Sequence, residues 1–122
     1  MTILQISIPT FNRVKEIQYC LDSLLSAIKF IKKKDRPFIG VYIYSNSTKK
    51  VSEYNELISS YSSKFIDLNI AYFRFKITGF DIGPFNNITL SLLESKADYT
   101  WVLPDDDLAR LDSIEVILNT IK

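Results

Sequence analysis

The sequence predicts an α/β fold, in which a mostly parallel β-sheet carries helices on both faces. Strand-like apolar stretches alternate along the chain with segments whose apolar residues recur at helical spacing. Polar segments follow three of the predicted strands, at positions 10–13, 45–48 and 105–107. Because parallel strands end at the same edge of a sheet, we expect these three segments to meet in one crevice.

Two predicted strands, each followed by a helix, account for the first half of the chain. The strand at 3–8 is rich in β-branched residues and stops at Pro9. Asn12 is suited to cap the next helix, which the apolar spacing predicts from about 13 to 32. The second strand is expected at 38–44. Apolar positions then mark a second helix at Val51, Tyr54, Ile58 and Tyr61.

The second half repeats this alternation. A third strand is predicted at 69–75, and Gly83-Pro84 begins a helix, because proline is favoured at the first helical position. A fourth, buried strand is predicted at 98–103, and a last helix begins at Asp112. The third helix is expected to bury its apolar residues, Phe85, Ile88, Leu92 and Leu93.

Composition narrows the functional classes. The 122 residues are expected to form one domain, 1–122, and the net charge of +1 argues against a general electrostatic binder of nucleic acid. The chain has no histidine, which excludes the usual zinc sites and a histidine general base. Its one cysteine, Cys20, cannot form an intrachain disulfide. With no signal peptide and no membrane-spanning run recognised, the expected location is the cytoplasm.

Three consecutive carboxylates, Asp105, Asp106 and Asp107, follow the fourth predicted strand. Like charges this close repel, and a bound cation is one way to compensate them. Oxygen ligands favour Mg²⁺ or Mn²⁺, and an ion held there would face a diphosphate. The alternative interpretation is a solvated acidic turn in which one acid caps the following helix.

At this point the residues resemble a known family. Segments 6–13 and 20–24 are similar to the opening of family 2 glycosyltransferases with the GT-A fold. Residues 83–84, Asn87 and segment 97–107 are similar to bacterial sugar transferases of O-antigen and capsule assembly, with the abequosyltransferase-like branch as the nearest. The resemblance implies a Rossmann-like, nucleotide-binding GT-A half. It also implies inverting transfer of a sugar from a nucleotide-diphosphate sugar to a saccharide or lipid-linked acceptor in surface polysaccharide synthesis.

The resemblance also implies roles for individual residues. Asp105 and Asp107 would hold Mn²⁺ or Mg²⁺. Ser45 stands where family members usually carry an aspartate that pairs with the base, and the Asn46 amide is the candidate substitute. Pro104 stands where many members have the first acid. The residues expected to bind the nucleotide are Pro9, Thr10, Phe11, Arg13, Ser45, Asn46 and Asp106.

Family members continue well past the position at which this chain ends, and the continuation supplies the acceptor pocket and a carboxylate general base. We therefore expect a domain that lacks the acceptor-binding half, located in the cytoplasm or peripherally at the inner face of the membrane, and no general base is assigned. The alternative is a non-catalytic nucleotide-binding or interaction module, from a truncated or split enzyme. Its uncovered sheet edge would favour a homo-oligomer or a partner chain. A receiver domain is disfavoured, because it needs an acid pair where this chain has Pro9 and Thr10.

Overall fold

The computed structural model describes residues 2–46, 49–77 and 83–121. These residues form an α/β, Rossmann-like fold around a four-stranded, all-parallel sheet in the order β3-β2-β1-β4, as predicted. The strands are β1 (Leu4–Thr10), β2 (Ile39–Ser45), β3 (Tyr72–Ile77) and β4 (Tyr99–Val102). The connections between successive strands carry helices, because parallel neighbours require crossovers.

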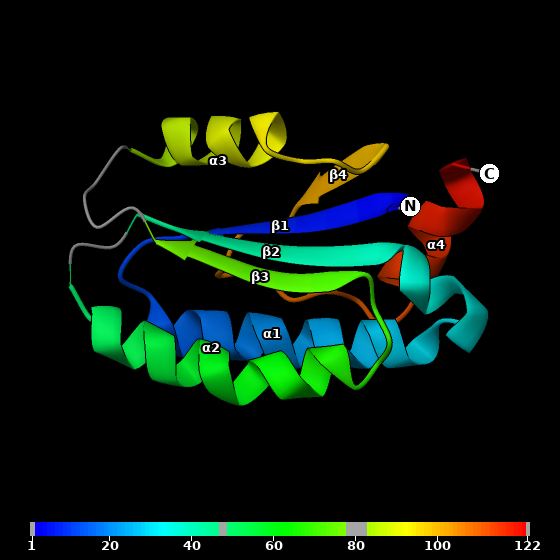
Figure 1. Ribbon diagram of the computed structural model, residues 1–122, viewed down its shortest axis with the longest axis horizontal. Coiled ribbons are helices and arrows are strands. Elements are labelled where there is room, and N and C mark those ends of the chain that lie inside the picture. Colours follow the sequence, from blue (N-terminus) through cyan, green and yellow to red (C-terminus); the bar gives the residue numbers. More distant parts are fainter. Residues whose placement is uncertain (1, 47–48, 78–82, 122) are drawn as a thin grey trace.

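Helices lie on both faces of the sheet (Figure 1). Two long helices, α1 (Val14–Phe30) and α2 (Val51–Ile66), lie side by side on one face. The opposite face carries α3 (Pro84–Leu93), which packs on β1 and β2. The last helix, α4 (Ser113–Ile121), packs against α1, and a short 3₁₀ helix (Lys33–Phe38) leads into β2.

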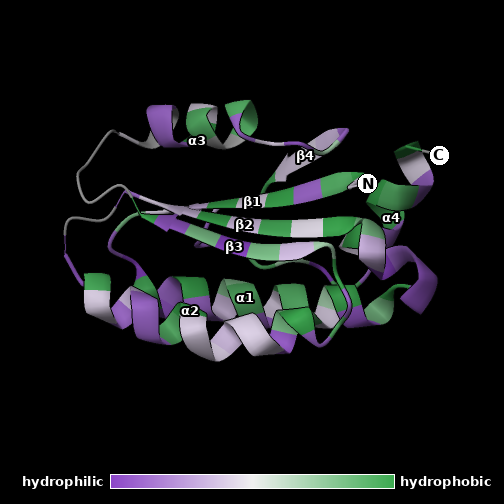
Figure 2. Ribbon diagram, in the orientation of Figure 1, coloured by the Kyte–Doolittle hydropathy of each residue, from purple (hydrophilic) through white to green (hydrophobic). Residues whose placement is uncertain are grey.

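The hydrophobic core lies between the sheet and the α1–α2 layer (Figure 2). Successive side chains of a strand point to opposite faces, so alternate residues of each strand enter this layer. They meet fully buried residues of both helices, among them Ile17 of α1 and Tyr54 of α2. The strand residues in this core include Leu4, Ile6, Ile8, Ile39, Val41 and Ile43.

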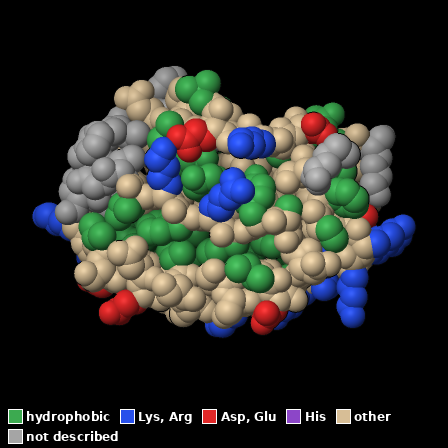
Figure 3. All heavy atoms as spheres, in the orientation of Figure 1, with side chains coloured by type: hydrophobic (Ala, Val, Ile, Leu, Met, Phe, Trp, Pro, Cys, Tyr) green, Lys and Arg blue, Asp and Glu red, His purple; other side chains and the backbone are tan. Residues whose placement is uncertain are grey.

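The sheet face that carries α3 is polar and aromatic. Tyr42 and Tyr44 of β2 stack with ring centroids 4.2 Å apart, and the Tyr72 hydroxyl donates to Gln5 Oε1. At the β3 edge, hydrophobic side chains gather in a band over the seam between the sheet and the two helices beneath it (Figure 3). Apart from the exposed Arg74, β3 is half-buried throughout.

Several predicted boundaries were wrong for identifiable reasons. Asn12 does not cap α1: its φ is 52°, its Oδ1 accepts a bond from the Lys49 N–H, and Arg13 is the N-cap residue. The first helix ends at Phe30 because Ile31 is extended. The third strand begins at Tyr72, since the left-handed Asn69 (φ 61°) first ends the turn after α2.

Two predictions of burial were also wrong. The fourth strand is not buried as a whole: Tyr99 is 50% exposed, because β4 has a neighbouring strand on one side only among the described residues. In α3, Leu92 and Leu93 are 50% and 79% exposed, since nothing in the described chain covers that end of the helix. The predicted helix start was correct, with Pro84 in the first turn after Gly83 (φ 83°). The predicted burial of the Phe85 side chain lies outside the described residues.

In the part of the chain that the structure describes, no helix is long and apolar enough to cross a membrane.

Candidate functional site

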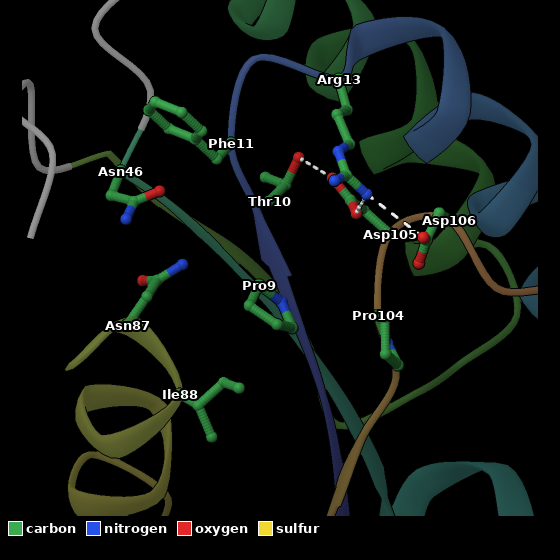
Figure 4. Close-up of a pocket in the computed structure, with 10 residues that line it drawn as sticks. All are labelled: Pro9, Thr10, Phe11, Arg13, Asn46, Asn87, Ile88, Pro104, Asp105 and Asp106. Atoms are coloured by element: carbon green, nitrogen blue, oxygen red, sulfur yellow. Dashed lines mark hydrogen bonds and ion pairs between the residues drawn. The ribbon is translucent and has the colours of Figure 1, made fainter. Parts of the chain in front are cut away.

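A cavity of about 330 Å³ opens at the carboxyl edge of the sheet (Figure 4). The ends of β1 and β2 are in register there, with Thr10 beside Ser45, and the Asn46 N–H donates to the Thr10 carbonyl. The segment after β4 joins them, because the Leu103 N–H donates to the carbonyl of Ser7 in β1. Three segments far apart in the sequence therefore form one site, as the strand-end argument predicted.

Most of the residues expected to bind a nucleotide line this cavity. Ser45 does not, and its side chain is fully buried at the end of β2. Residues 47–48 of the predicted polar loop lie outside the described part of the chain. Of the two residues expected to hold a metal ion, Asp105 lines the cavity and Asp107 does not. The expected nucleotide-binding residues that line the cavity are Pro9, Thr10, Phe11, Arg13, Asn46 and Asp106.

A directional chain of hydrogen bonds underlies one end of the cavity. The backbone N–H of Arg13 donates to the Tyr54 hydroxyl at 2.7 Å, and the Thr10 hydroxyl donates to Asp105 Oδ2 at 2.7 Å. Tyr54 and Thr10 are themselves bonded, also at 2.7 Å. Because the Thr10 hydrogen is used on Asp105, the Tyr54 hydroxyl must be the donor in this middle bond.

The chain closes into a ring through the side chain of Arg13. Its Nη1 lies 3.5 Å from Asp105 Oδ1 and 3.2 Å from Asp106 Oδ2 (Figure 4). Asp105 is only 5% exposed, and burial raises its pKa above the ordinary value of 3.8. The Thr10 bond and the Arg13 charge act in the opposite direction on this pKa, while Asp106 raises it further. Asp105 is thus a buried carboxylate that depends on its donors.

The neighbouring acids occupy different environments. The Asp107 N–H donates to the Pro104 carbonyl at 3.1 Å, which closes a turn and leaves the side chains of Asp106 and Asp107 exposed. Among the described residues, no three Cys, Asp or Glu side chains are gathered closely enough to hold a metal ion. The residues still suit a hard cation such as Mg²⁺, which binds one or two carboxylates and takes its other ligands from water and substrate phosphates.

Sequence reasoning missed the contribution of α3 to the opposite end of the cavity. Asn87 and Ile88 of α3 line the cavity at that end. Pro104, which lines the cavity at the end near the acids, was also not predicted to bind the nucleotide. Asn87 Nδ2 donates to the Tyr44 carbonyl at 3.0 Å, which fixes the orientation of the amide, because a carbonyl can only accept. Figure 4 shows the Asn87 and Asn46 amides pointing toward one another across the cavity.

Asn87 is 2% exposed, and its Oδ1 has no hydrogen-bond partner among the described residues. A buried amide oxygen is an acceptor for an N–H or O–H group. Asn87 belongs to the motif that carries the family resemblance, but the local sequence does not place it in the cavity, since it does not show which sheet face the third helix covers.

The fold is similar to that of TarS from S. aureus, a GT-A glycosyltransferase. A crystal structure of TarS superposes with a TM-score of 0.74 at 18% identity, over 98% of this chain and 19% of the TarS chain. A crystal structure of TarS 1-349 gives a TM-score of 0.73 at 18% identity, over 98% of this chain and 32% of that one. No protein-family model matches the chain, and no curated protein matches its sequence. At this identity the likeness shows the fold alone.

Proposed function

We propose that this chain is the donor-binding part of a GT-A glycosyltransferase. The whole enzyme would transfer a sugar, with inversion, from a nucleotide-diphosphate sugar to a saccharide or lipid-linked acceptor in surface polysaccharide synthesis. A cytoplasmic location, free or at the inner face of the membrane, is part of this proposal. The observation that carries it is the two-ended cavity at the carboxyl edge of the sheet, with amides at one end and charges at the other.

The amide end suits a nucleobase. Asn46 and Asn87 offer amide groups, and the partly exposed Phe11 ring offers an apolar surface on which a base can stack. The charged end suits a diphosphate. Arg13 is both the guanidinium of this end and the N-cap residue of α1, so an anion there would also meet the positive end of the helix dipole.

The charge balance supports a requirement for a divalent cation. Two carboxylates, Asp105 and Asp106, line the cavity against one guanidinium, and Asp107 follows directly. A diphosphate would be repelled by this excess of negative charge unless a cation compensated it. A bound Mn²⁺ or Mg²⁺ would neutralise charge on the departing diphosphate.

Asp107 and Asp106 are the exposed candidates to hold this ion. Asp105 already has Thr10 on one oxygen and Arg13 on the other, so serving as a ligand would require it to release Arg13.

Calorimetric titration tests the proposal directly. UDP, GDP, CDP and TDP are titrated into the 122-residue chain with and without Mn²⁺, and then into Asp107→Ala and Asp98→Ala. Asp98 is the matched control, because it is also an exposed acid but precedes β4, at the opposite edge of the sheet. We expect one nucleotide to bind in a Mn²⁺-dependent manner, with the loss of this binding in Asp107→Ala only. Absence of binding, or binding that ignores both metal and Asp107, would contradict the proposal.

A second candidate function is a non-catalytic interaction module. The exposed Leu92 and Leu93 at the end of α3 and the exposed Tyr99 of β4 favour it, since exposed apolar side chains next to a short edge strand suit contact with a second copy of the chain. Sedimentation velocity separates the two functions. A monomer at all concentrations that binds nucleotide contradicts the module, whereas a dimer that Leu93→Glu dissociates supports it.

A further inference from the structure

Arg13 contacts two carboxylates through the same nitrogen, Nη1, and the two are held differently. Asp105 is buried and also receives the Thr10 hydroxyl. The Asp106 side chain is 56% exposed, and Arg13 is the partner that the described residues offer to its carboxylate. One carboxylate is therefore fixed in the protein, while the other is bound at the surface by a single ion pair.

We infer that Asp106 occupies, in the ligand-free chain, the position on Arg13 that a ligand phosphate takes, so that binding exchanges one anion for the other. The inference rests on the proposed function and concerns the regulation of that same site. Carboxylate and phosphate oxygens compete for the same guanidinium N–H groups. Asp105 cannot be the exchanged group, because removing a buried carboxylate from its partners is costly. An exposed ion pair is weak enough to be replaced.

The exchange couples nucleotide binding to a divalent cation. Release from Arg13 leaves the Asp106 carboxylate without its counter-charge and beside the carboxylate of its sequence neighbour, Asp107. A divalent cation bound there would compensate both negative charges. Conditions that favour the released state of Asp106 therefore favour phosphate on Arg13. By thermodynamic reciprocity, nucleotide must raise the affinity for the cation by the same factor by which the cation raises the affinity for nucleotide.

The test is a mutant cycle measured by calorimetry, first without metal. The nucleotide that binds best is titrated into the wild-type chain, Asp106→Asn, Arg13→Gln and the double variant. An exposed ion pair is worth about 0.2 to 1 kcal/mol, which predicts that Asp106→Asn tightens metal-free binding up to about fivefold. In the Arg13→Gln background the same substitution is expected to give a smaller gain, because only the loss of repulsion remains once the guanidinium for which the two anions compete is gone.

Asp107→Asn is a second comparison that does not need Arg13 to be replaced. It removes the same charge from the adjacent residue, whose side chain makes no ion pair with Arg13. A smaller metal-free gain than in Asp106→Asn supports the exchange, whereas an equal gain shows plain repulsion and overturns it. This comparison decides the matter if Arg13→Gln does not fold.

Titration with Mn²⁺ completes the experiment. The ratio of nucleotide dissociation constants without and with Mn²⁺ is expected to be smaller in Asp106→Asn than in the wild type. An unchanged or weaker metal-free affinity in Asp106→Asn overturns the exchange alone and leaves the proposed function standing. No nucleotide binding to the wild-type chain with Mn²⁺ overturns the proposed function and the exchange together.

Discussion

Tyr54 connects the core of the molecule to its cavity, and replacing it by phenylalanine isolates that connection. The ring is fully buried in the α1–α2 layer, so Tyr54→Phe leaves the packing in place. It removes one oxygen that takes part in two hydrogen bonds, from the Arg13 N–H and to Thr10 Oγ1. Phenylalanine supplies no acceptor for that N–H, which stays in the partly buried start of α1.

The expected cost follows from these two bonds. A net hydrogen bond contributes about 0.5–1.5 kcal/mol, and a buried donor left without a partner costs about 1–3 kcal/mol. Tyr54→Phe is therefore expected to lower the free energy of unfolding by about 2 kcal/mol. For a domain of this size that corresponds to a melting temperature lower by about 8 °C. Urea unfolding followed by far-UV circular dichroism measures the change.

Nucleotide affinity should fall as well, since Arg13 and Thr10 line the cavity and both lose their bond to Tyr54. A less preorganised guanidinium is expected to weaken binding by about threefold to tenfold. Tyr61→Phe is the matched control: Tyr61 lies on the same helix, is also buried, and donates to Asp22, which is not part of the cavity. It should lower stability and leave affinity unchanged.

Two results would refute this reasoning. If Tyr54→Phe changes the free energy of unfolding by less than about 0.5 kcal/mol, the hydrogen bonds of the Tyr54 hydroxyl stabilise the fold no more than hydrogen bonds to water would. If Tyr61→Phe weakens nucleotide binding as much as Tyr54→Phe does, the effect on affinity is a general loss of order. Thr10→Val is measured alone and combined with Tyr54→Phe. If the two hydroxyls act in one chain of hydrogen bonds, the double variant should lose less stability than the sum of the two single losses.

Three further predictions concern other parts of the molecule. Gly40→Ala should lower the free energy of unfolding by about 1–3 kcal/mol, because a Cβ at Gly40 would lie 2.3 Å from Tyr72 Cζ, and the hydrogen bond of the Tyr72 hydroxyl to Gln5 holds that ring in place. The loss should be smaller in a Tyr72→Ala background. The Cys20 thiol should resist a disulfide reagent at pH 8 until the chain unfolds, because burial raises its pKa to about 12; rapid labelling of the native protein would contradict this. The stability advantage of the wild type over Asp105→Asn should grow as the pH falls from neutrality toward 3.8, as urea unfolding at several pH values would show. The raised pKa means that the folded state binds this proton first, so stability is gained on acidification.

The fold could be predicted from the sequence because the period of the apolar residues switches repeatedly between strand and helix. The order of elements and the parallel sheet follow from that alternation alone. Burial of β4 and α3 could not be predicted in the same way. Whether Trp101 or Leu93 is covered depends on which elements lie above them, and the local pattern of an uncovered strand or helix is the same as that of a covered one.

The candidate site was predictable only where it follows strand ends. Thr10, Asn46 and Asp106 meet because each follows or ends a parallel strand, and parallel strands share an edge. Asn87 lies on α3, and its position over β2 depends on the path of the connection between β3 and β4. The local sequence does not determine that path. Tyr54 was one of the apolar positions that predicted the second helix, and the structure places it in the hydrophobic core. Its hydroxyl is the feature that sequence spacing cannot assign.

Asp105 and Asp106 show how one short segment supplies two different carboxylates. The turn closed between Pro104 and Asp107 sends the first acid inward, where burial makes its charge costly, and leaves the second at the surface. Burial fixes Asp105 to Thr10 and Arg13, because an unpaired charge there would be unstable. Exposure makes the pairing of Asp106 with Arg13 weak and exchangeable. A guanidinium shared between one fixed and one replaceable anion keeps its position while its outer contact changes, and this is the property that a cavity for a phosphate-bearing ligand requires.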